Sequence, residues 1–386
     1  MTAPTNTLPE RTLRGADLQT LVQVLQDQHS RKVDVVMPAS KLQAHDVNGT
    51  RGLEFYDLPA QVSESGVTDV NGLYAPTSAA IGHLADKFGI PLAYLRRCQT
   101  DNWPLFEKNI AGWAENDDRK FLVRLLHGQH DGSQGILRAV LSDGYGFRDH
   151  IDTVMALLTG MRAAGLSADN IGTADLSDNR LYLRVKAPEI SVMAPELLKG
   201  YRSPFTGAEG ADNPVVYAGL LIRNSETGGG ALSITPELRI QVCDNGLQIT
   251  PDAIRSVHLG SRLDEGQVNW ASDTQEAYEA LIAKKVRDAV TAFLTPEYVR
   301  STVEKITEDA KTPLDDPKAV EVVAKQLRFN EGEQAALMAH FVKGGQMTAG
   351  GVCQAITSVA QEISDADRSN EFAATALKGL ELAAAL

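Results

Sequence analysis

The hydrophobic period of this chain changes near residue 273, and this change limits the folds open to it. From residue 119, apolar side chains alternate with polar ones, as in strands whose side chains point in turn to two faces. Beyond Asp273, apolar residues recur every three or four positions, which is the period of a helix. The sequence therefore predicts an α+β fold, in which an antiparallel sheet with crossing helices is followed by an all-helical C-terminal region.

The same patterns divide the 386 residues into three predicted regions. The first is mostly helical, the second is the antiparallel β-sheet core with one crossing helix, and the third is the helical C-terminal region; they span residues 1–118, 119–262 and 263–386. Within the first region, the Gly, Asp, Asn and Pro content of residues 46–76 predicts loops. Within the second, two hairpins are expected, and their strands are 119–126 with 136–142, and 215–223 with 231–243.

Charge and composition exclude several classes of protein. The net charge is −13, which argues against coating duplex nucleic acid by bulk charge. The charge is uneven, because residues 263–386 hold 12 basic and 20 acidic residues, or −8, and leave −5 for the rest. No apolar run reaches the roughly 18 residues of a membrane span, and the polar start lacks a secretory signal. With three widely spaced cysteines, these features predict a cytoplasmic protein, of the host cell if phage-encoded, with no membrane partner.

Familiar catalytic motifs are absent from the sequence. It has no ATPase phosphate loop, dinucleotide-binding glycine pattern, zinc-hydrolase motif or serine-hydrolase elbow, so we expect no cofactor, no metal and no catalysis. The polar segment 127–135 contains His127 and His130 but is typical of a turn. Cys243, Asn245 and His258 are the residue types of a Cys-His hydrolase, which is a weaker alternative. The simpler interpretation of Cys243 is a buried thiol beside a turn.

The polar side of the predicted strands carries an unusual set of residues. Alternation places leucine and valine on the core side and basic or tyrosine side chains on the other. Basic groups interleaved with aromatic rings are typical of surfaces that bind single-stranded nucleic acid. An ordinary solvated face of an antiparallel sheet is the alternative. If all the strands share one sheet, this face holds Lys120, Arg124, Arg138, Arg180, Tyr182, Arg184, Lys186, Tyr217, Arg223 and Arg239, with Glu237 as its one acid.

Three short motifs resemble a known family. They are Ser142-Asp143 followed by Tyr145, the step Asn224-Ser225-Glu226, and Cys243 followed by Asn245. Together with the segments around them, over roughly residues 75–262, they resemble the phage- and plasmid-borne family called domain of unknown function 932. The resemblance implies a gene on a mobile element, often near DNA-processing and antirestriction genes, and it implies no established activity.

These observations lead to two hypotheses. The first is a non-catalytic phage or mobile-element protein that binds single-stranded DNA, with ATP-independent strand-annealing recombination as its most specific form. Such a protein gains affinity by repetition, so we expect a homo-oligomer, either a ring or a filament. The second is a protein-binding antirestriction or host-takeover factor, in which the acidic helical end contacts a host or phage protein. The sequence leaves open the physiological substrate, the subunit number and the preference between DNA and RNA.

Overall fold

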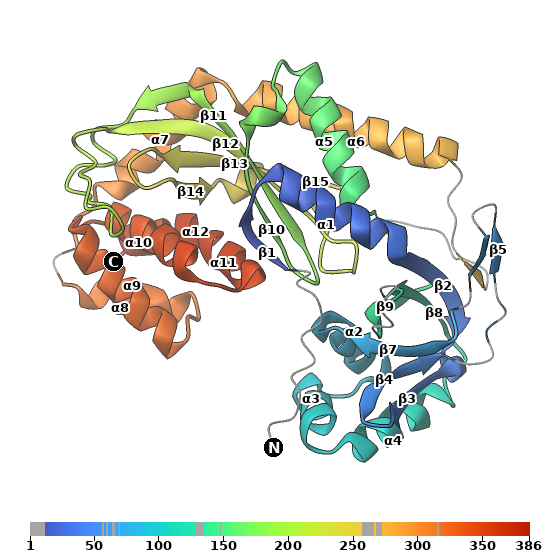
Figure 1. The fold of residues 1–386 in the computed structure, drawn as a ribbon. Helices are drawn as coiled ribbons and strands as arrows, with labels where there is room; N and C mark the ends of the chain where they lie inside the picture. Colours follow the sequence, from blue (N-terminus) through green and yellow to red (C-terminus); the bar gives the residue numbers. More distant parts are fainter. Residues whose placement is uncertain are drawn as a thin grey trace.

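The fold is α+β, as the change of period predicts (Figure 1). The computed structural model describes residues 12–55, 58, 61–63, 66–68, 70–128, 134–146, 148–256, 266–267, 272–314 and 316–386. Two sheets organise these residues, and each has its own helices and its own hydrophobic core.

The first sheet, sheet A, has the strand order β1-β10-β11-β12-β13-β14, with β15 also paired to β13. All of its pairs are antiparallel. Its strands are β1 (Leu13–Ala16), β10 (Ile171–Leu176), β11 (Leu181–Met193), β12 (Val215–Asn224), β13 (Leu232–Ile240), β14 (Asn245–Gln248) and β15 (Ile254–Ser256). The predicted second hairpin is confirmed as β12 and β13, which pair from Val216 with Ile240 to Arg223 with Ser233.

The second sheet, sheet B, has the order β16-β2-β8-β9-β7-β4-β3 and is antiparallel except for β7 beside β9. Its strands are β16 (Gly266–Gln267), β2 (Lys32–Pro38), β8 (Lys120–Leu126), β9 (Gly135–Ser142), β7 (Gly72–Pro76), β4 (Thr50–Phe55) and β3 (Leu42–Val47), and β5 (Gln61–Ser63) pairs separately with β6 (Gly66–Thr68). The predicted first hairpin is confirmed as β8 and β9.

Two expectations about the strands are wrong. Residues 119–262 do not form one sheet, because β8 pairs with β2 and β9 with β7, and both partners come from the first 76 residues. Residues 46–76 are not only loops, because they contribute strands to sheet B. Asn48 and Gly49, with φ of 54° and 86°, form the turn between β3 and β4. Asn-Gly is the dipeptide that a tight hairpin favours, so the sequence held this signal.

The helices cover the sheets in separate groups. Sheet B packs on α2 (Ser78–Phe88), α3 (Leu92–Asp101) and α4 (Trp103–Ala114). The leucine and valine side of sheet A packs on α1 (Leu18–Arg31), α5 (His150–Ala163), α6 (Ser272–Phe293) and α7 (Pro296–Ala310). Thr77 caps α2 by accepting from the Ala80 amide, and Gly89 ends it with φ of 65°.

The remaining helices gather at the β14 edge of sheet A, where α10 and α12 also contact α7 (Figure 1). They are α8 (Lys318–Gln326), α9 (Glu331–Gly344), α10 (Ala349–Glu362), α11 (Ala366–Ala373) and α12 (Ala376–Ala384), and short 3-10 turns occur at Ala39–Lys41, Ala168–Asn170 and Thr250–Asp252. Helices α10, α11 and α12 contact β14, the edge strand. In the described ranges, no helix combines the length and apolarity needed to cross a bilayer.

Candidate functional site

The alternation on sheet A separates apolar from polar side chains as predicted, but the polar side is not an open face. Leu181, Leu183 and Val185 of β11 point into the core. The side chains between them point to the opposite side, where α10 and α11 cover them, so Tyr182 is only 1% exposed. Tyr217 and Arg239 are also buried. The expectation of a solvent-facing basic surface is therefore wrong for these strands.

Helix α11 covers one end of this polar side. Arg180 Nη1 lies 2.8 Å from Glu371 Oε1, and the Tyr182 hydroxyl donates to Asp367 at 3.0 Å. Arg184 donates from Nη2 to Asn370 Oδ1 at 2.7 Å. Acidic and amide groups from α11 thus take the positions where the sequence suggested phosphate and bases.

At the other end of the polar side of sheet A, several side chains contact Asp244, which lies in the turn between β13 and β14. Lys186 Nζ lies 2.6 Å from Asp244 Oδ2, and the Tyr217 hydroxyl donates to Oδ1 at 2.5 Å. Arg239 donates to Asp244 at 3.1 Å and to Glu237 at 2.9 Å. Burial alone would raise the pKa of Asp244, but the charge of Arg239 and the hydrogen bonds from Lys186 and Tyr217 hold that pKa below its usual range.

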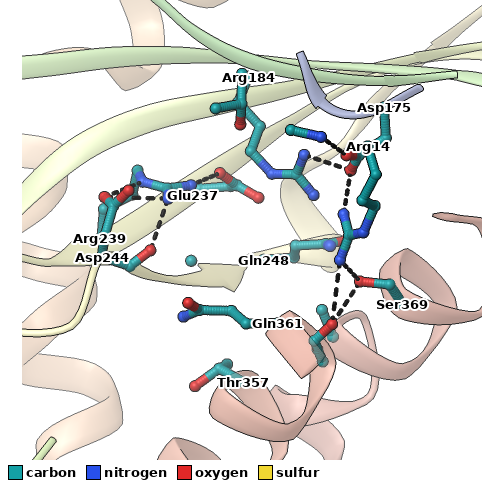
Figure 2. A pocket seen from close by; sticks show the side chains of 15 residues that line it. Arg14, Asp175, Arg184, Glu237, Arg239, Asp244, Gln248, Thr357, Gln361 and Ser369 are labelled. Atoms are coloured by element: carbon teal, nitrogen blue, oxygen red, sulfur yellow. Dashed lines mark hydrogen bonds and ion pairs between the residues drawn. The ribbon is translucent and has the colours of Figure 1, made fainter. Parts of the chain in front are cut away.

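Between these two ends lies a pocket of about 300 Å³, which we call the polar cleft (Figure 2). Three guanidinium groups reach it from three strands: Arg14 from β1, Arg184 from β11 and Arg239 from β13. Arg14 and Arg184 share the buried carboxylate of Asp175, at 2.6 and 2.8 Å. The polar cleft is lined by Arg14, Gly15, Thr173, Asp175, Arg184, Glu237, Arg239, Asp244, Gly246, Gln248, Thr357, Ala360, Gln361, Ser369 and Ala373.

Uncharged polar groups complete the lining of the polar cleft. Gln248 comes from β14, and Thr357 and Gln361 come from α10 on the opposite wall (Figure 2). Arg14 bridges the walls, because its Nη2 donates to Ser369 Oγ at 2.5 Å and to the Ala360 carbonyl at 3.3 Å. The cleft therefore offers both donors and acceptors, with three arginines balanced by three carboxylates, and suits a polar ligand that carries both kinds of group.

The predicted residues of sheet B lie elsewhere. Arg124 and Arg138 are buried between the two sheets, and Lys120 is half-buried at the start of β8. Arg124 donates to Asp34 and to Asp149, both at 2.6 Å, and Arg138 pairs with Glu226. They are not at the polar cleft, because the first hairpin belongs to sheet B. Arg223, the last predicted residue, is half-buried on β12.

The ion pairs around Arg124 form a buried cluster that joins the sheets, which we call the junction cluster: Lys32, Asp34, Arg124, Arg138, Asp149, His150 and Glu226. Burial would raise the pKa of Glu226, but Arg138 and His150 beside it lower that pKa to about 2. Burial lowers the pKa of His150 to about 4, so the ring is neutral at pH 7. Its Nε2 has no hydrogen-bond partner within the described residues.

The hydrolase hypothesis rests on Cys243, Asn245 and His258. Cys243 is buried, and its Sγ lies 3.9 Å from the Ile240 carbonyl oxygen. His258 lies outside the described residues, as do the side chain of Asn245 and, in the segment 127–135, residues 129–133. Across the described ranges, no group of three His, Cys, Asp or Glu side chains is arranged to hold a metal ion.

Neither a family model, nor a curated protein, nor a solved structure matches this chain.

Sequence reasoning found some residues of the polar cleft and missed others. It selected Arg184 and Arg239, and it noted Glu237 as the acid of that face. It missed Arg14, Asp175 and the residues from α10 and α11. For Arg14 the signal in the sequence is the glycine that follows it, because in the structure Gly15 has φ of 63° and its amide donates to Asp175 at 2.8 Å. For the helical residues no local signal exists, because their partners are remote in the chain.

Proposed function

We propose that this protein binds single-stranded DNA without catalysing a reaction, as a phage or mobile-element protein, and that the polar cleft is where the strand is held. The observation that carries this proposal is the convergence of Arg14, Arg184 and Arg239 on one pocket. Guanidinium groups bind phosphate with a planar fork of donors, and three of them reach the cleft from different strands.

The rest of the lining supports a nucleotide rather than a bare anion. A bare anion would gain little electrostatic binding energy in the cleft, because Asp175, Glu237 and Asp244 balance the charge of the arginines. A nucleotide also carries base edges with donors and acceptors, which amide side chains such as Gln248 and Gln361 pair with. The volume of about 300 Å³ lies at the lower end of ordinary ligand pockets, which suits one nucleotide of a strand.

A binding assay with a matched pair of variants tests the proposal. The probe is a fluorescently labelled thymine oligonucleotide, compared with duplex DNA and RNA at two salt concentrations. Arg14→Ala should weaken binding about tenfold and reduce the salt slope by roughly 0.7, because one phosphate contact is lost. Arg97→Ala is the control, since Arg97 is 82% exposed on α3 and pairs only loosely with Asp101. Equal binding by Arg14→Ala and the parent would remove the cleft as the site.

One observation favours the second candidate, a protein-binding antirestriction or host-takeover factor. Tyr94, Leu105 and Trp113 are exposed large side chains on α3 and α4. Leu105, Asn109 and Trp113 lie on one stripe of α4, and Asn109 donates to the Tyr94 hydroxyl at 3.3 Å. An exposed apolar and aromatic stripe is typical of a protein contact. If the parent binds no nucleic acid at either salt concentration, this candidate replaces the first.

A further inference from the structure

We infer that α11 is an internal competitor for the single strand, because the Glu371 carboxylate holds the Arg180 guanidinium and yields it to a phosphate when DNA enters the polar cleft. This inference rests on the proposed function, since it concerns the regulation of the same site. It adds a phosphate contact beyond the cleft and a means by which the chain restrains its own affinity.

Helix α11 places its polar groups against the side chains of Arg180, Tyr182 and Arg184, at the start of β11. Asp367, Asn370 and Glu371 are three and four positions apart, so they share one face of the helix. That face meets Tyr182 through Asp367, Arg184 through Asn370 and Arg180 through Glu371. Asp367 Oδ1 also lies 3.9 Å from Arg180 Nη1, beyond hydrogen-bond distance. A carboxylate that accepts from a guanidinium stands in for a phosphate oxygen at the same donor.

The pair of Arg180 with Glu371 is the exchangeable one. The Glu371 side chain is 48% exposed, so water and salt screen its attraction for Arg180. Arg184, by contrast, pairs with Asp175, whose side chain is fully buried. Breaking that pair would leave the buried carboxylate with Arg14 as its remaining guanidinium, which opposes exchange.

Exchange at Arg180 does not require α11 to leave the sheet. Phe372 anchors the helix, because its ring is fully buried and stacks on Phe329 with 4.0 Å between centroids. Arg180 is also held from its other side, since Nε donates to the Gly229 carbonyl at 2.7 Å. The guanidinium therefore stays in place while Glu371 turns to solvent and a phosphate takes its position.

The test compares Glu371→Gln with Glu381→Gln in the same oligonucleotide assay. Both glutamates lie on C-terminal helices, both pair with a basic residue, and both side chains are 48% exposed. Each substitution changes the net charge equally. Glu371→Gln should tighten binding about five- to tenfold at low salt, because the phosphate no longer displaces a carboxylate from Arg180, and the gain should shrink at high salt, which screens that carboxylate in the parent. Adding Arg180→Gln should abolish this gain.

The outcomes separate the inference from the proposed function. One outcome is that Glu371→Gln binds the oligonucleotide like the parent, while Arg14→Ala weakens binding in both backgrounds. In that case α11 is not a competitor and the cleft remains the site. If Glu381→Gln tightens binding as much as Glu371→Gln, net charge explains the gain and the inference is overturned. If neither the parent nor Glu371→Gln binds the oligonucleotide, the proposed function fails and the inference fails with it.

Discussion

Replacing Arg124 by methionine should destabilise the protein strongly, because Arg124 is the cation at the centre of the junction cluster. It is 1% exposed and donates to Asp34 from two nitrogens, at 2.6 and 3.0 Å. It also donates to Asp149 at 2.6 Å and to the carbonyl of Glu226 at 2.7 Å. Methionine fills similar volume but removes the guanidinium that Asp34 and Asp149 share, and leaves Lys32 as the lysine near both carboxylates. Removing one partner of a buried ion pair costs about 3–5 kcal/mol.

This loss is measured by urea unfolding followed by circular dichroism. The control is Arg97→Met, whose exposed pair with Asp101 should change the free energy of unfolding by less than about 0.5 kcal/mol. The double variant Arg124→Met with Asp34→Asn should recover part of the loss, because it also removes the stranded charge. A loss below about 1 kcal/mol for Arg124→Met would refute the argument that this cluster holds the sheets together.

The pH dependence of the same variant gives a second check. Burial raises the pKa of Asp34 even with Arg124 present, and removal of the cation raises that pKa further. A carboxyl whose folded pKa is raised above its unfolded value lowers stability as the pH rises through the folded pKa. The difference between parent and variant should therefore be larger at pH 7 than at pH 4.

Other predictions concern single positions. The free energy of unfolding should fall as the pH is lowered from 6.5 to 4, because the folded pKa of His150 is lowered to about 4 and protonation favours the unfolded chain. His150→Gln should flatten this pH dependence. An unchanged pH dependence in the variant would contradict the role given to His150. Phe372→Ala should cost about 3–5 kcal/mol in urea unfolding, whereas Val342→Ala at an exposed position should cost little. Gly160→Ala should destabilise by about 1–3 kcal/mol, because its Cβ would lie 2.4 Å from the Ala283 carbonyl oxygen; Gly112→Ala, with open space around it, should not destabilise. Light scattering should show a homo-oligomer, and a monomer with and without DNA would contradict that expectation.

The sequence predicted local structure well because local structure depends on neighbouring residues. Alternation along β11 correctly placed Leu181 and Leu183 in the core and Arg184 on the other side. It could not show what covers that other side, since Asn370, the partner of Arg184, lies 186 residues further on. The prediction of a single sheet failed for the same reason, because β8 pairs with β9 as expected but also with β2, where Val123 lies opposite Val35.

The candidate site was harder to predict than the fold. Basic residues interleaved with tyrosines suggested a solvent-facing surface that binds nucleic acid. The same residues also fit a buried sheet face, when a helix distant in the chain supplies the acids that pair with them. The uneven charge of the chain was the available hint. Residues 263–386 carry an acidic excess, and α11 within them places acids against basic side chains such as Arg180. The junction cluster gave no hint, because Asp34 and Arg124 meet only when β2 pairs with β8, and Asp149 reaches Arg124 from the start of α5.

The contacts of Arg14 have a consequence for how the protein is made. Its partners Ala360 and Ser369 lie 346 and 355 residues further along the chain. During translation, β1 leaves the ribosome long before either partner is synthesised, so the nascent chain holds no finished cleft. Products that stop before α11 would contain every described strand of sheet A and α10, but would lack Ser369 and Ala373 of the pocket lining. The complete set of Arg14 contacts therefore forms only in chains whose synthesis has passed Ser369.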